Sequence, residues 1–232
     1  MPKLKPNIAS IEEKVDLDFI LKELDSRNVL NHATIVLVGS VARGTETKFS
    51  DIDLLIITQA KVAPWIPPAH IQLHFEPRDR FIERLKKGDD FPSWALHFGE
   101  VLYDSDGWWQ TILADAKLKS IWPDWYAKIL HAERRLKMAE SVLETEDMDA
   151  AQEEYLFAAT NLARAVLLRA FVFPLSRAEL PQQLRSIGDK ALASILESLI
   201  SEELGIKKLR KIGVALREKL LDLKKKKNLT PP

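Results

Sequence analysis

The sequence contains no cysteine, carries no net charge and has no long hydrophobic run. Without cysteine the chain can form neither a disulfide nor a thiolate metal site, which is typical of a reducing cytosol. Its 34 basic and 34 acidic residues balance, so no global positive charge favours bulk binding of nucleic acid. No apolar segment approaches the length of a membrane span. We therefore expect a cytoplasmic protein with no membrane partner.

The pattern of hydrophobic residues changes near the middle of the chain. Its 232 residues suffice for two ordinary domains. Strand-like runs occur only in the first half, whereas long helical patterns occupy the second half. We predict an α+β fold, with a small mixed β-sheet and flanking helices in residues 1–120. An all-α antiparallel helical bundle is expected in residues 121–228, followed by a disordered tail at 229–232.

Two carboxylates stand at the start of the strongest strand signal. Asp51 and Asp53 are separated by one residue and lead into the apolar run 54–57. In a strand, residues i and i+2 point to the same face, so the two carboxylates should project side by side. Such a pair repels unless a cation lies between them, and Mg²⁺ prefers oxygen ligands that it shares with substrate phosphates. We therefore predict that Asp51 and Asp53 are catalytic residues that bind Mg²⁺ or Mn²⁺.

A Gly-Ser pair follows the preceding strand, which is expected over residues 32–38. A short helix is predicted from Val41 to Arg43, and backbone N–H groups at such a turn can bind phosphate. Arg43 is either a cation for the phosphates or an ordinary surface arginine. A hydroxyl directly before the carboxylates can orient them through a hydrogen bond. The predicted nucleotide-binding residues are Gly39, Ser40, Arg43 and Ser50.

These segments together resemble a known family signature. Gly39-Ser40, Ala42-Arg43-Gly44 and Ser50-Asp51-Ile52-Asp53 are similar to the motif of the DNA polymerase β-like nucleotidyltransferase superfamily, especially its minimal nucleotidyltransferases. The resemblance covers roughly residues 33–103. It implies an enzyme that transfers a nucleoside monophosphate from a magnesium-bound NTP, with ATP as the favoured nucleotide.

The family also places a third carboxylate, which binds metal and acts as general base, on a later strand. Aligned on the strand pattern, that position falls on Gln72, which we predict as the third catalytic position. A glutamine amide can ligate a metal but cannot accept a proton. Glu76 lies about 13 Å further along the strand, too far to replace it. His74 is an alternative base, or a solvated side chain.

The same segment should alternate between two faces. We expect Ile71, Leu73 and Phe75 to point one way. Gln72, His74 and Glu76 are expected to point the other way. Because of Gln72, two functions stay open. The first is an enzyme that relies on metal and positioning, and the second is a catalytically weakened, nucleotide-binding regulatory or antitoxin-like protein.

Four or five amphipathic helices are predicted after Pro123. We expect a cap at Asp149 for the second, a start near Leu184 for the third and a last helix over 206–223. Segments 163–170 and 176–181 resemble the helical domains of the kanamycin-nucleotidyltransferase or HEPN kind. The resemblance implies an acceptor pocket. A homodimer through the helical domain is a separate expectation. His131 lacks the preceding arginine of the HEPN ribonucleases, which argues against RNA cleavage. The acceptor is a small molecule, an RNA end or a protein hydroxyl.

Overall fold

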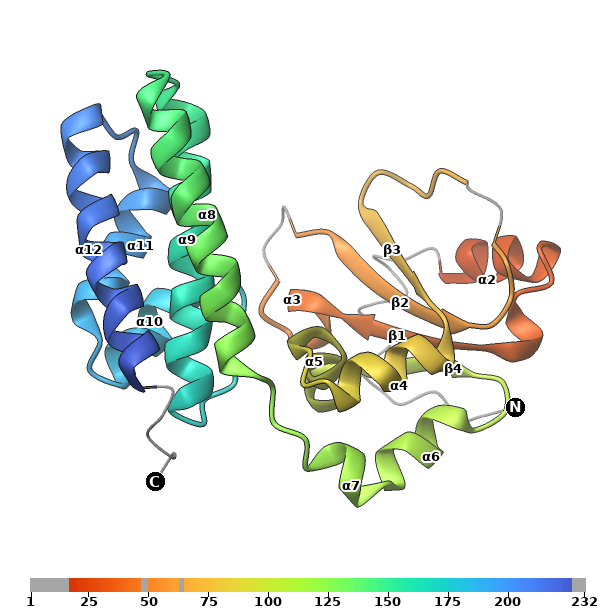
Figure 1. Ribbon diagram of the computed structural model, residues 1–232. Coiled ribbons are helices and arrows are strands. Elements are labelled where there is room, and N and C mark those ends of the chain that lie inside the picture. Colours follow the sequence, from red (N-terminus) through yellow and green to blue (C-terminus); the bar gives the residue numbers. More distant parts are fainter. Residues whose placement is uncertain (1–16, 47–49, 63–64, 227–232) are drawn as a thin grey trace. The chain divides into compact units, whose positions relative to one another are not determined.

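The computed structural model describes residues 17–46, 50–62 and 65–226, and the expected tail at 229–232 lies outside them. The chain divides into two compact units, residues 1–123 and 124–232. Figure 1 shows the helices and strands of both units, coloured along the sequence from the N-terminus to the C-terminus. Within the described ranges, no helix combines the length and the hydropathy that crossing a membrane requires.

A four-stranded mixed sheet forms the centre of the first unit. The strands follow one another in space in the order β3-β2-β1-β4. Strand β1 pairs antiparallel with β2 and β4, whereas β2 and β3 run parallel. This is the mixed sheet expected from the sequence. The strands are β1 (Ala33–Val38), β2 (Ile52–Thr58), β3 (Ile71–Glu76) and β4 (Glu100–Asp104).

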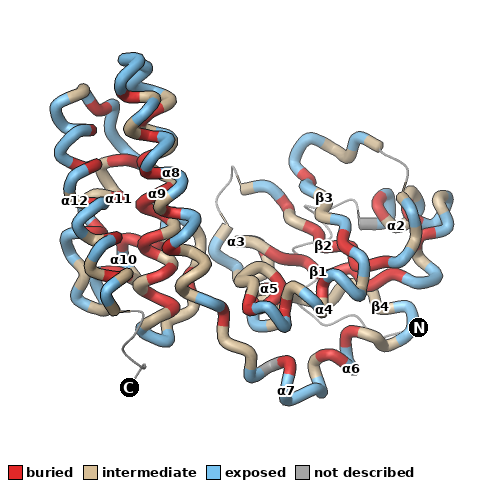
Figure 2. Tube along the Cα trace, viewed as in Figure 1, coloured by how far each residue is buried: buried red, intermediate tan, exposed pale blue. Residues whose placement is uncertain are grey.

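Helices cover both faces of the sheet, which is why the two central strands are apolar on both sides. Figure 2 shows buried residues along β1 and β2. Helix α2 packs Ile20 and Leu24 on the face that carries Ile35 and Leu54. The opposite face is covered from α4, α5 and α6. The helices of this unit are α2 (Leu17–Ser26), α3 (Gly39–Ala42), α4 (Arg78–Lys86), α5 (Asp90–Phe98), α6 (Trp108–Ala114) and α7 (Ala116–Lys119), with a 3₁₀ turn at Leu30–His32.

One local expectation for this unit was wrong. The 3₁₀ turn at Leu30–His32 delays the first strand by one residue, so it begins at Ala33. At the end of β3 burial does not follow polarity, because Phe75 is 40% exposed while Glu76 is only 6% exposed. Glu76 is buried because two arginines of α4 neutralise it, as described below. A sequence pattern cannot indicate such a partner.

The second unit forms five helices around one core in residues 124–226, the part of it that the structure describes. They are α8 (Trp125–Glu144), α9 (Met148–Arg169), α10 (Leu180–Ser186), α11 (Lys190–Ser201) and α12 (Ile206–Lys225). The core consists mainly of leucine and alanine side chains, and all five helices contribute to it. The all-helical unit is consistent with the expected HEPN-like bundle.

The helix starts differ from the sequence expectation in two places. Asp147, not Asp149, caps α9 by accepting a hydrogen bond from the backbone N–H of Ala150. The third predicted helix is two helices, because Gly188 adopts a left-handed φ of +87° and Asp189 caps a new start.

Candidate functional site

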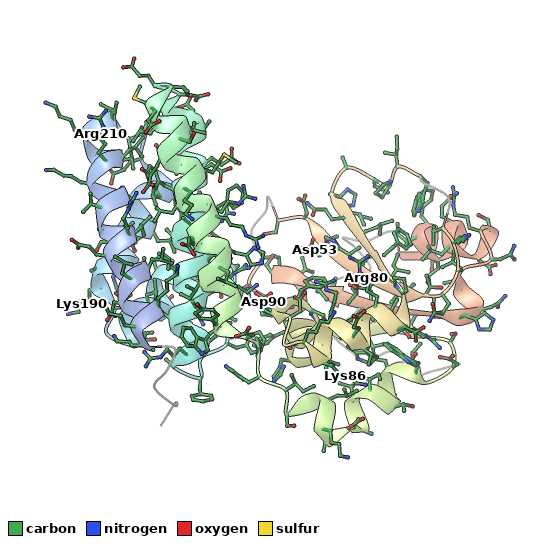
Figure 3. All side chains as sticks on the ribbon, in the orientation of Figure 1. Asp53, Arg80, Lys86, Asp90, Lys190 and Arg210 are labelled. Carbon is green, nitrogen blue, oxygen red and sulfur yellow. The ribbon has the colours of Figure 1, made fainter. Side chains whose placement is uncertain are left out.

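The two predicted metal ligands lie at the beginning of β2. Asp51 immediately precedes the strand and is exposed, and the side chain of Asp53, labelled in Figure 3, is 28% exposed. Leu55 and Ile57 continue the Asp53 face into one hydrophobic cluster, whereas Ile52 and Leu54 belong to the other. Both carboxylates therefore stand on the face of the sheet that α4, α5 and α6 cover, at the start of β2.

Strand β3 holds both carboxylates through its side chains. Its parallel register places Gln72 opposite Asp53. The amide nitrogen Nε2 of Gln72 donates to Oδ2 of Asp51 over 2.8 Å. Nε2 of His74 lies 3.2 Å from Oδ1 of Asp53. Each carboxylate is thus held through one oxygen, and the strands bring together three residues predicted from the sequence, with His74 as a fourth member.

Gly39 closes the other side of the site. Val38 at the end of β1 pairs with Asp53, so the next residue lies directly against that carboxylate. Gly39 has a φ of +80°, and a Cβ atom there would lie 2.4 Å from Oδ2 of Asp53. Only glycine satisfies both the left-handed backbone and the close approach.

The remaining predicted nucleotide-binding residues surround this turn. Helix α3 spans Gly39–Ala42 rather than the predicted 41–43, because Ser40 already accepts hydrogen bonds from the backbone N–H groups of Arg43 and Thr45. Ser50 directly precedes Asp51 in the chain. The guanidinium carbon of Arg43 lies 5.8 Å from the ring centroid of Trp94 in α5. This cation–aromatic contact joins the Gly-Ser turn to α5.

Glu76 does not belong to the site. Its carboxylate forms an ion pair with Arg84 at 2.5 Å and lies 3.6 Å from Arg80. Arg84 also donates to Asp89. Burial opposes the charge of Arg84, but the hydrogen bond to Asp89 and the charge of Glu76 outweigh it and raise its pKa above the usual value. Glu76 therefore fastens α4 to the end of β3.

Sequence reasoning missed the aromatic contribution of α5. The ring of Phe91 lies 5.8 Å from the ring of His74, and Trp94 accompanies Arg43. The two aromatic residues are three positions apart and so share one face of α5. The helical pattern could indicate that Trp94 faces inward, but no local signal connects this helix to residues of β3 or α3.

A groove runs along β3 next to these residues. It has a volume of about 680 Å³ and includes Gln72 and His74 in its wall. Its apolar side comes from the segment between β2 and β3, with Val62 and Trp65, and from Phe75. This volume lies within the range of small-molecule sites.

The donor atoms present fit a magnesium ion that is shared with substrate. In the parts of the chain that the structure describes, no three His, Cys, Asp or Glu side chains converge on one point. Two carboxylates nevertheless suffice for Mg²⁺, which usually takes one or two protein carboxylates and completes its shell with water and phosphate oxygens. Asp51 and Asp53 supply these two, and the close approach of Gly39 leaves room for Asp53 where a side chain would collide with it.

Comparison with known proteins agrees with this geometry. The family model of the nucleotidyltransferase domain matches residues 17–98, which contain β1, β2, β3 and α5. No curated protein matches the chain. The crystal structure of a nucleotidyltransferase-like protein from Exiguobacterium sibiricum 255-15, at 1.90 Å resolution, is similar with a TM-score of 0.50 and 17% sequence identity. The match covers 82% of this chain and 69% of that chain, and at this identity it shows the fold alone. Residues 17–98 of this protein are therefore similar to a nucleotidyltransferase domain.

Proposed function

We propose that this protein transfers a nucleoside monophosphate from an NTP onto a hydroxyl group of an acceptor. The observation that supports this most strongly is the pair Asp51 and Asp53, which two β3 side chains hold beside the Gly39 turn. In the proposed reaction the acceptor oxygen attacks the α-phosphorus, and a new O–P bond forms. The bond from the α-phosphorus to its bridging oxygen breaks, and pyrophosphate leaves.

Each residue of the site has a role in this proposal. Asp51 and Asp53 would hold Mg²⁺. The bound ion would neutralise negative charge on the phosphates. Gly39 and Ser40 line the triphosphate, while Arg43 provides a fixed cation and Ser50 orients Asp51. Gln72 keeps Asp51 in place but cannot act as a base. The hydroxyl proton therefore passes to water or to a phosphate oxygen, and the rate depends mainly on positioning.

We place the acceptor in the groove along β3. Gln72 and His74 line this groove and also contact the two carboxylates, and these shared residues support the placement. Its mixed wall, with Trp65 on one side and the polar residues on the other, suits an acceptor that has an apolar body and a hydroxyl group.

A nucleotide-binding regulatory protein is the second candidate, and Gln72 is the residue that favours it. Where the family has a carboxylate, this chain has an amide that donates to Asp51. Such a site can bind Mg-NTP and still turn over slowly or not at all.

Titration calorimetry of each NTP, with and without Mg²⁺, tests both candidates. We expect magnesium-dependent binding that Asp51→Asn and Asp53→Asn abolish, together with pyrophosphate release when an acceptor is present. Asp25→Asn is the control, because Asp25 is an exposed carboxylate on α2 away from the carboxylate pair. Binding without pyrophosphate release supports the regulatory candidate, and no magnesium-dependent binding contradicts both.

A further inference from the structure

A second groove lies in the helical unit, between α8 and α12, with α9 beneath it. Its volume is about 410 Å³, and its wall combines two arginines, two glutamates, a tyrosine and a few apolar groups. These residues are Glu140, Leu143, Glu144, Tyr155, Arg210, Gly213, Val214 and Arg217. Nothing in the proposed nucleotide chemistry uses this groove.

Tyr155 is the central feature of the groove. Its side chain is only 1% exposed, and its ring is part of the bundle core. The residue nevertheless lines the groove, and its hydroxyl makes no hydrogen bond with any residue that the structure describes. Buried tyrosine hydroxyls normally find a partner, and a phenylalanine would fill the core equally well. The fold by itself therefore does not explain the hydroxyl.

Gly213 makes room for this hydroxyl. It lies inside the 20-residue helix α12, where glycine is less favourable than alanine. A Cβ atom at Gly213 would lie 2.6 Å from the Tyr155 hydroxyl oxygen. The helix thus carries an unfavourable residue at a position where a methyl group would collide with the tyrosine.

Ion pairs between α8 and α12 show which residues of the two helices lie opposite each other. Glu133 pairs with Lys224, and Glu140 pairs with Arg217, so seven residues along α8 correspond to seven residues back along α12. Continuing this antiparallel register places Glu144 opposite Gly213. Arg210 lies three residues before Gly213, about 4.5 Å along the helix axis toward the start of α12.

One end of the groove therefore holds two opposite charges that are not used by the fold. Arg210, labelled on α12 in Figure 3, and Glu144 are both exposed. Neither forms an ion pair or hydrogen bond within the described residues. At the other end Glu140 and Arg217 neutralise each other.

The electrostatics at Tyr155 agree with this placement. Burial raises the pKa of its hydroxyl above the usual value, and the negative charge of Glu140 raises it further, whereas Arg217 and Arg210 lower it. Charges from both ends of the groove thus act on the hydroxyl.

We propose that this groove binds the head group of an α-amino acid. An α-amino acid carries an ammonium and a carboxylate, and Glu144 and Arg210 of the same groove have the opposite charges. Glu144 accepts from the ammonium group, Arg210 donates to the carboxylate with its planar fork, and the Tyr155 hydroxyl donates a further hydrogen bond. The side chain of the ligand lies on Leu143 and Val214, which is 60% exposed.

Calorimetry on the full-length protein tests the proposal with L-leucine, L-phenylalanine and L-lysine as probes. Their N-acetyl and amide derivatives are the comparison, because each derivative lacks one of the two head-group charges. We expect saturable binding of at least one free amino acid, and at least tenfold weaker binding of both of its derivatives. Equal binding of a derivative overturns the proposal, and so does the absence of saturation by all three free amino acids.

Variants link the binding to this groove. Arg210→Gln and Glu144→Gln should each weaken binding at least tenfold, and Tyr155→Phe about two- to tenfold, because it removes one hydrogen bond and keeps the packing. Arg134→Gln, at an exposed arginine of α8 outside the groove, should leave the affinity unchanged. Circular dichroism confirms that each variant is folded. Unchanged affinity in folded Arg210→Gln and Tyr155→Phe variants contradicts the proposal, whatever the outcome of the nucleotide experiments.

Discussion

The contact between Gly39 and Asp53 is the tightest constraint on a single residue of the candidate site. We predict that Gly39→Ala destabilises the protein and weakens Mg-NTP binding more than tenfold. The new Cβ would meet Asp53 Oδ2 at 2.4 Å, and alanine is strained by about 1–2 kcal/mol at the φ of +80°. Urea unfolding and nucleotide calorimetry measure the two effects.

Gly44→Ala provides the matched control for this change. Gly44 also has a left-handed φ, of +64°, but a Cβ there would meet no atom within 4 Å. The control should show the backbone strain alone and keep nucleotide affinity. If both variants lose affinity equally, the approach to Asp53 has no part in binding.

Gln72 offers a second test at the residue scale. We predict that Gln72→Glu lowers the melting temperature in the absence of divalent cations at pH 7. The new carboxylate would face Asp51 Oδ2 at 2.8 Å, where two like charges repel. Millimolar Mg²⁺ should restore the melting temperature, and the magnesium-dependent increase should exceed that of the wild type.

Gln110→Glu controls for the added charge, because Gln110 is exposed on α6. Thermal unfolding with and without Mg²⁺ compares the three proteins. A magnesium response of Gln72→Glu that equals those of wild type and control argues against a metal beside Asp51.

At the scale of the elements, the side chain of Gln152 in α9 holds the segment that connects α11 to α12. Nε2 of Gln152 donates to the carbonyl oxygens of Leu199 and Glu202, and its Oε1 accepts from the backbone N–H of Leu204. We predict that Gln152→Ala lowers the free energy of unfolding by about 1–3 kcal/mol, because three backbone groups lose their partner. Chemical denaturation measures this loss, and Glu153→Ala at the exposed neighbour should have little effect.

The ion pair between Glu133 of α8 and Lys224 of α12 predicts that the stability of the protein depends on pH. Lys224 donates to Glu133 over 2.6 Å, and this hydrogen bond with its charge lowers the pKa of Glu133 below the ordinary 4.5. A lowered folded pKa means that the stabilisation is present above pH 4.5 and disappears as the pH falls through the folded pKa. Both side chains are partly exposed, so we expect less than about 1 kcal/mol.

Glu133→Gln should therefore lower the melting temperature slightly at pH 7 and leave it unchanged near pH 3. Melting curves over this pH range test the expectation, with the exposed Glu218→Gln as control. A difference between Glu133→Gln and wild type that persists at pH 3 contradicts the assigned cause.

For the whole molecule, each unit has its own hydrophobic core. The bundle core draws only on α8 to α12, and the two sheet clusters draw only on the first unit. We predict that residues 124–232 produced alone fold cooperatively into a helical protein and bind no Mg-NTP. Circular dichroism and calorimetry check this. A fragment without a cooperative unfolding transition shows that its core needs the rest of the chain.

Local patterns in the sequence indicated much of this architecture. The apolar runs of β1 and β2, the spacing of Asp51 and Asp53 and the helical periodicity after Pro123 depend only on nearby residues, so the mixed sheet and the bundle could be predicted. The Gly-Ser pair and Gln72 were recognised through the family signature. Short-range chemistry that the pattern did not resolve, such as the cap at Asp147 and the break at Gly188, shifted helix boundaries by a few residues.

Tertiary structure alone decided which side chains meet. The contacts of Gln72 with Asp51 and of His74 with Asp53 depend on the parallel register of β2 and β3, which are separated by a long connection. Glu76 is buried because Arg84 reaches it from the next helix. The Tyr155 groove likewise needs α8, α9 and α12 together. The sequence by itself determined the elements and their polar faces, because these follow from local periodicity, whereas contacts across strands and helices follow from packing of the whole chain.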